Sequence, residues 1–144
     1  MKRQVSFIVG CLLFMWVGVS CAAESDDDSS KVGKVLTQLF DRPNARLTVD
    51  AVAVVSDHSL ASWSQSGRGG RALLRRVSGN WQIILCGGKD LMQVDALTKA
   101  GVPATQAQAI SQQLSSSEQK LPAVKRLAYD NFTMEPATSH SSKH

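Results

Sequence analysis

The fold is decided by the stretch from residue 47 to residue 86, which reads LTVDAVAVVSDHSLASWSQSGRGGRALLRRVSGNWQIILC. At its start Leu47, Val49 and Ala51 fall on every second position, and a period of two is typical of a β-strand. Turn-forming runs of Ser, Asp, Asn and Gly interrupt the stretch three times. Three short turns between four strands predict an antiparallel meander, with strands at 47–55, 60–65, 70–77 and 81–86.

On either side of this stretch, the apolar residues change to the spacing of a helix. Before it, Val32, Leu36 and Leu39 share one helical face, and the helix ends before Pro43 because the residue preceding a proline leaves the helical region. We expect helices over 31–40, 89–100, 104–119 and 122–132. The predicted fold class is α+β: an N-terminal helix, a four-stranded antiparallel meander and two to three C-terminal helices, with the sheet covered on one face.

The two ends of the chain differ in composition from this domain. Residues 1–23 run from a basic start through an uncharged apolar stretch to small residues, which is the order of a bacterial secretory signal peptide. Residues 24–30 predict a flexible acidic leader, 31–132 a single domain, and 133–144 a disordered tail that contains Met and His. We expect a periplasmic or otherwise exported protein, either soluble or lipidated through Cys21.

Charge and composition narrow the classes of partner and of function. The signal holds two of the 16 Lys and Arg residues and none of the 12 Asp and Glu residues, which leaves a net charge of +2. So small a charge gives no case for a nucleic-acid partner. After residue 23 no apolar run approaches the length of a membrane span. No acid/base pair, triad or hydrolase motif is recognisable, so we do not expect an enzyme.

The tail carries the first candidate metal ligands, Met134, His140 and His144. Imidazole and thioether are ligands for copper, and a thioether favours Cu(I). A disordered polar terminus is the alternative interpretation of the same residues.

Cys86 and His58 are the candidate site residues inside the domain. Alternation places Cys86 on one face of its strand with Gln82 and Ile84. A small packed residue, a soft-metal ligand together with Met92, and a nucleophile activated by His58 are the three alternatives, with core packing favoured.

A glycine- and arginine-rich segment, GRGGR at 67–71, is the remaining feature that suggests binding. It loosely resembles a phosphate-binding loop, but no helix follows it, and a hairpin turn explains the glycines. Arg71 and Arg75 share one face of the predicted strand, which is either the solvated side of the sheet or a surface for an anionic partner.

The sequence resembles a family of small exported bacterial proteins, the copper uptake system-associated proteins. The resemblance lies in five segments and continues to Pro103: FDRP at 40–43, VVSDH at 54–58, ASW at 61–63, GRGGRALLRR at 67–76 and WQIILCGG at 81–88. It implies a non-catalytic accessory role in extracytoplasmic copper handling, which favours the tail residues Met134, His140 and His144 as copper ligands and copper-transport components of the cell envelope as partners. It assigns no ligand role to His58 or Cys86, and the present tail has only two histidines and one methionine.

Two functions are therefore expected as alternatives. The first is an exported accessory protein of copper uptake that binds copper through its C-terminal tail. The second is a periplasmic protein-interaction module that uses the arginine-rich face, or the surface around Trp63 and Trp81, and has no metal role.

Overall fold

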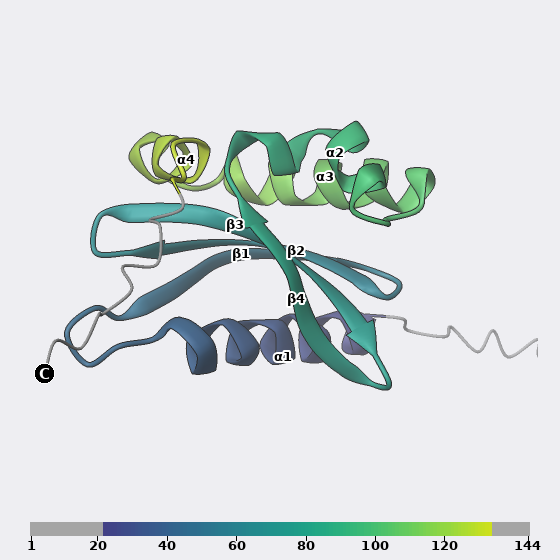
Figure 1. Ribbon diagram of the computed structural model, residues 1–144, viewed down its shortest axis with the longest axis horizontal. Coiled ribbons are helices and arrows are strands. Elements are labelled where there is room, and N and C mark those ends of the chain that lie inside the picture. The colour runs from purple at the N-terminus through teal and green to yellow at the C-terminus, as the bar shows by residue number, and fades with distance from the viewer. Residues whose placement is uncertain (1–21, 134–144) are drawn as a thin grey trace, which may run out of the picture.

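The computed structural model describes residues 22–133, and it has a four-stranded antiparallel sheet between two layers of helices (Figure 1). The elements in chain order are α1 (Ala22–Phe40), β1 (Leu47–Val55), β2 (His58–Gln65), β3 (Arg68–Val77), β4 (Asn80–Gly87), the 3-10 helix η1 (Lys89–Met92), α2 (Val94–Lys99), α3 (Ala104–Glu118) and α4 (Ala123–Asp130). The strands lie in the order β1-β2-β3-β4, as the meander predicted. The α+β class is therefore confirmed, and the predicted signal peptide 1–23 lies almost entirely outside the described residues.

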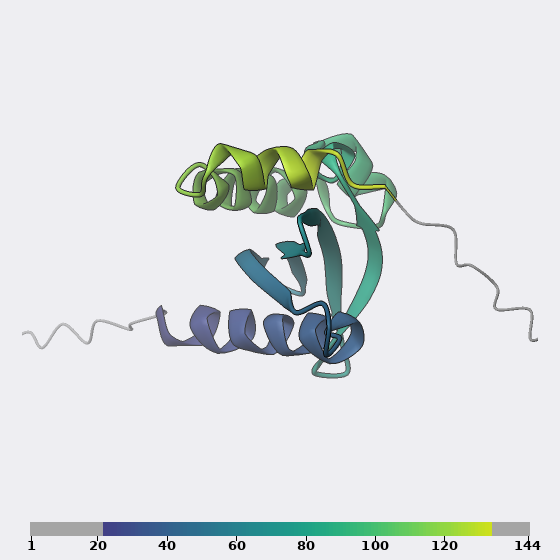
Figure 2. The same ribbon diagram turned by 90° about the vertical axis from the view of Figure 1, so that its left-hand side faces the viewer.

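Helices cover both faces of the sheet, so the expectation of one covered face is wrong (Figure 2). The helix α1 packs on one face, where Val32 and Leu36 are fully buried in a cluster with Leu74 and Trp81. The helices α2 and α3 pack on the other face through a second apolar cluster, which consists of Ala53, Leu60, Leu73, Leu91, Leu97, Val102, Ala107, Ile110 and Leu114. The strands supply side chains to both clusters because successive residues of a strand point to opposite faces.

The acidic segment 24–30 belongs to α1, so its prediction as a flexible leader is wrong. Carboxylates near the N-terminus of a helix interact favourably with the helix dipole. Asp28 is also buried and forms an ion pair with Arg76 of β3, and Asp27 lies 2.6 Å from Lys31 one turn later. The ion pair between Asp28 and Arg76 therefore stabilises the N-terminal extension of α1. Local sequence patterns do not indicate this contact, because the two residues are far apart in the chain.

Two β-bulges change which residues share a face of the sheet. One lies in β1 between Val49 and Ala51, and the other in β4, where Leu73 and Leu74 of β3 face Leu85 and Ile83. A bulge places two residues opposite one and shifts the alternation by one position. Cys86 therefore packs with Trp81 and Ile83 in the cluster against α1. The prediction that it shares a face with Gln82 and Ile84 is wrong.

Candidate functional site

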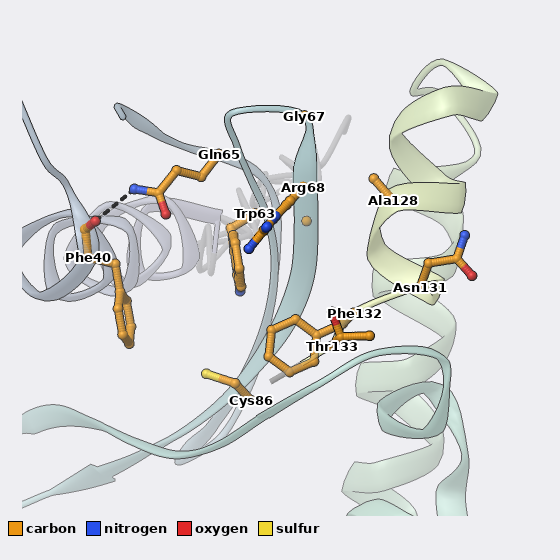
Figure 3. A pocket seen from close by; sticks show the side chains of 11 residues that line it. Phe40, Trp63, Gln65, Gly67, Arg68, Cys86, Ala128, Asn131, Phe132 and Thr133 are labelled. Carbon is orange, nitrogen blue, oxygen red and sulfur yellow. Dashed lines mark hydrogen bonds between the residues drawn. The ribbon is translucent and has the colours of Figure 1, made fainter. Parts of the chain in front are cut away.

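A pocket opens where four elements end on the same side of the molecule (Figure 3). Its volume is about 670 Å³, which is within the usual range for ligand-binding pockets. Its walls come from the last residue of α1, the β2–β3 hairpin, the end of β4, and the residues at and after the end of α4. The side chains that determine its chemistry are those of Phe40, Trp63, Arg68, Cys86, Ala128 and Phe132.

Aromatic rings from separate elements line this pocket. The rings of Trp63 and Phe132 meet edge to face, with centroids 5.8 Å apart and an interplanar angle of 84°. Gln65 fixes the end of α1 against the hairpin, because its side-chain amide donates to the backbone oxygens of Phe40 at 2.8 Å and Ala45 at 2.6 Å. The buried Nε1 of Trp63 has no hydrogen-bond acceptor within the described part of the chain. Gln65, Arg68, Asn131 and Thr133 also line the pocket, so its walls combine aromatic rings with polar groups.

The glycines of GRGGR and of the following GG pair bring the end of α4 close to the sheet. A Cβ at Gly70 would lie 2.6 Å from the Phe132 ring, and a Cβ at Gly69 would lie 2.8 Å from the Tyr129 ring. At Gly88 it would lie 2.8 Å from the backbone oxygen of Asp130. These glycines therefore allow the close approach of residues 129–132. The segment forms a hairpin, in which Gly67 has a φ of +77°, as the turn interpretation predicted.

Cys86 lies in the wall of the pocket, and its side chain points toward the side on which Phe40 and Trp63 lie (Figure 3). The thiol is half-buried, and burial raises its pKa above the ordinary value of 9.0. A neutral thiol in apolar surroundings is a poor nucleophile and must lose its proton before it can bind a metal ion.

His58 lies on the opposite face of the sheet from Cys86. It is buried, and its Nδ1 is 2.9 Å from the Oε1 atom of Gln106 in α3. Met92 also packs on the α3 face. The structure therefore brings neither His58 nor Met92 to Cys86, and a Cys86–His58 catalytic pair is ruled out.

The other three candidate ligands, Met134, His140 and His144, lie outside the described residues. Within residues 22–133 no three His, Cys, Asp or Glu side chains come together in a group that could hold a metal ion. Thr133, which directly precedes Met134, lines the pocket that contains Cys86. The chain thus continues toward the tail from the edge of this pocket.

Arg71 is buried, so the expectation that it belongs to a solvated face is wrong. Its Nε and Nη2 atoms donate to the two carboxylate oxygens of Glu118 at 2.8 and 2.7 Å, and its Nη1 atom donates to Asp130 at 2.8 Å. Ser62 also donates to Glu118. Burial alone would lower the pKa of Arg71, but Glu118 and Asp130 outweigh it and raise the pKa. Arg75, on the same face of β3, is exposed.

One signal in the sequence could have indicated this buried ion pair. Ala107, Ile110 and Leu114 form the apolar stripe of α3, and Glu118 continues the same spacing by four residues. A carboxylate in line with a buried stripe requires a cationic partner from another element. Arg71 is that partner, although the sequence alone does not identify which arginine it is.

Comparisons of this chain with protein-family models, with curated proteins and with solved structures find no match. No helix within residues 22–133 is both long enough and apolar enough to cross a membrane.

Proposed function

We propose that this protein is an exported, non-catalytic accessory protein of bacterial copper handling, which binds Cu(I) through Cys86 and the C-terminal tail. The proposal is supported above all by the position of Thr133 at the pocket that contains the Cys86 thiol. Met134, the first candidate ligand of the tail, directly follows Thr133 in the sequence. A thiolate and a thioether are both soft ligands that select Cu(I), and His140 and His144 add imidazoles from the same tail.

The aromatic walls suit such a site. They exclude water from one side of the ion, and a hydrophobic surrounding shell controls the access of solvent to a metal centre. Because burial raises the pKa of Cys86, a proton competes with the metal for the sulfur. We therefore expect Cu(I) affinity to increase as the pH rises toward the pKa of the thiol. His58 has no part in this site, because it contacts α3 on the other face of the sheet.

An anaerobic Cu(I) competition titration tests this proposal. It uses residues 22–144, in which Cys86 is the single cysteine. We expect one bound Cu(I), with affinity that decreases at least tenfold, or about 1.4 kcal/mol, in Cys86→Ser and in a chain that ends at Thr133. His58→Gln is the matched control, because it removes an imidazole distant from the pocket. If folded protein retains no Cu(I), or if the control loses as much affinity as Cys86→Ser, the proposal is wrong.

The arginines of β3 give less support to the alternative of a protein-interaction module, although Arg75 is exposed. Arg71 is buried against Glu118, and Arg76 stacks on Trp81 with its guanidinium carbon 4.7 Å from the ring centroid. We therefore do not propose a partner for that face.

A further inference from the structure

We propose that a cationic groove beside α4 binds the phosphate group of an anionic phospholipid, so that this side of the protein lies on a membrane surface. The groove has a volume of about 520 Å³ and is formed by α4, the end of α3, Arg71 of β3 and the η1 region. It shares no residue with the pocket that contains Cys86. The inference is therefore independent of the proposed copper function.

Two of the cations that line the groove have no counter-charge within the described part of the chain. The charged side chains in its walls are those of Arg71, Lys89, Arg126, Glu118 and Asp130. Both carboxylates bind Arg71, whereas Lys89 and Arg126 form no side-chain ion pair or hydrogen bond within residues 22–133. The walls thus carry more positive than negative charge, which favours an anionic ligand.

The groups around these two cations suit a phosphate. Arginine and lysine are the usual phosphate-binding side chains, the first through its fork of N–H donors and the second as a point charge. Gln93, Ser115 and Gln119 also line the groove and add neutral hydrogen-bonding groups. Asp90 follows Lys89 in the chain and is exposed, but it is not part of the groove wall.

An exposed apolar pair beside the groove favours a lipid over a soluble phosphate. Val124 is 72% exposed and Leu127 is 61% exposed, and residues three positions apart are neighbours on a helix. Leu127 also lines the groove, so the apolar pair and the cations adjoin. They lie in the helical layer on the opposite side of the sheet from α1 (Figure 2). A membrane interface accepts apolar side chains next to cations that attract anionic lipids, whereas a soluble phosphate leaves this pair in water.

Co-sedimentation with lipid vesicles tests the proposal. Metal-free residues 22–144 are used, because the apolar run of the predicted signal peptide would itself bind lipid. We expect binding to be roughly tenfold stronger with vesicles of phosphatidylcholine and phosphatidylglycerol than with phosphatidylcholine alone, and to weaken at high salt. Lys89→Gln combined with Arg126→Gln should lower the partition coefficient by roughly tenfold, because two cations leave the lipid surface.

Matched variants separate this groove from a general effect of charge or hydrophobicity. Lys34→Gln combined with Arg42→Gln also removes one lysine and one arginine, both of them exposed and in or next to α1. Leu127→Ser should weaken vesicle binding by about threefold or more, whereas Leu39→Ser, at a leucine of α1 that is 63% exposed, should not. If either control loses as much binding as its partner, the proposal is wrong.

Two checks keep this test decisive. Circular dichroism verifies that each variant is folded, and Leu127→Ser, which changes an exposed side chain, tests the site even if the double glutamine variant unfolds. The amide resonances of residues 89–93 should shift when short-chain phosphatidylglycerol is added. If inorganic phosphate shifts them but vesicles are not bound, the ligand is a soluble phosphate and the membrane proposal is overturned. Absence of binding to the anionic vesicles would also overturn it.

The variant Cys86→Ser separates this proposal from the proposed function. It should bind vesicles as the unchanged chain does, because Cys86 is not part of the groove. Vesicle binding by a protein without Cu(I) affinity would overturn the copper function alone. Cu(I) binding without affinity for anionic vesicles would overturn the lipid site alone.

Discussion

The helices α3 and α4 cover the same side of the sheet by opposite means (Figure 1). In α3, Ile110 and Leu114 are fully buried in the apolar cluster. In α4, Val124 is 72% exposed and Leu127 is 61% exposed, and the single fully buried side chain is Tyr129. Polar contacts hold α4 instead. The comparison shows that an apolar pattern identified both helices but indicated the buried face of only one of them.

The polar contacts of α4 form two groups on the sheet. Asp130 accepts from Arg71, which also binds Glu118 of α3. The Tyr129 hydroxyl donates to Asp50 at 2.8 Å, and Lys125 forms an ion pair with the same carboxylate. Asp50 is available for both because it occupies the bulge of β1. A bulge and a buried arginine therefore replace the apolar stripe that holds α3.

The largest expected effect comes from removing the shared cation with Arg71→Met. Glu118 would then be buried without its charge partner, which costs about 3–5 kcal/mol in the free energy of unfolding. Urea denaturation followed by circular dichroism measures the loss. The double variant Arg71→Met with Glu118→Met should recover most of it, because neither buried charge remains. A loss below about 0.5 kcal/mol in the single variant would show that the ion pair is not what holds this region.

The same leucine truncation in both helices tests the comparison directly. Leu114→Ala in α3 should cost about 2–5 kcal/mol, because it leaves a cavity in a fully buried cluster. Leu127→Ala in α4 should change the free energy of unfolding by no more than about 0.5 kcal/mol, since its side chain is largely in solvent. Equal losses in the two variants would contradict the assigned orientation of α4. The same denaturation experiment provides both values.

An intermediate effect is expected where α4 approaches the sheet most closely. Gly88→Ala would place a Cβ 2.8 Å from the Asp130 backbone oxygen, so the end of α4 must move, at a cost of about 1–3 kcal/mol. Gly33→Ala in α1 is the matched control, because a Cβ there meets no atom within 4 Å. Since alanine favours a helix over glycine, the control should be neutral or stabilising. A Gly88 variant as stable as the control would refute the close contact.

The smallest expected effect is the contribution of Tyr129 to the pH dependence of the free energy of unfolding. Burial, together with the hydrogen bond to Asp50, raises the pKa of Tyr129 above its ordinary value of 10.0. Above that pH the unfolded chain releases the phenolic proton while the folded chain keeps it. The free energy of unfolding therefore falls as the pH rises through the folded pKa.

Two measurements check this dependence. Tyr129 is the only tyrosine, so the ultraviolet absorbance of its phenolate reports the titration of this residue alone. The free energy of unfolding should decrease less steeply above about pH 10 in Tyr129→Phe than in the unchanged chain. Equal slopes, or a phenolate titration that occurs near pH 10 in the folded protein, would contradict the buried position of this hydroxyl.

Local patterns predicted the order of the strands and the positions of most helices. The period of two and the glycine turns between Leu47 and Cys86 were sufficient for the meander, and Pro43 and Gly101 marked helix ends. The patterns failed where a single inserted residue changed the period. The bulges at Asp50 and Ile84 moved later residues of β1 and β4 to the other face, which a strict alternation cannot represent.

The sequence predicted some residues of the candidate site, but it did not predict how they lie relative to one another. Cys86 was chosen for its chemistry, and the structure places it in a pocket; His58 was chosen for the same reason and lies on the other face. Trp63, Phe132 and Phe40 were not linked to Cys86, because they belong to separate elements. A single sequence contains no signal that brings these rings together.

By itself, the sequence of this protein determined a four-stranded meander with helices before and after it, because strand and helix periods and turn residues act over a few neighbouring positions. Only the tertiary structure decided that both faces are covered, that Arg71 is buried with Glu118, and that Cys86 and Trp63 line one pocket with the end of α4. These outcomes depend on contacts between residues tens of positions apart, and on bulges whose cost is offset by those contacts.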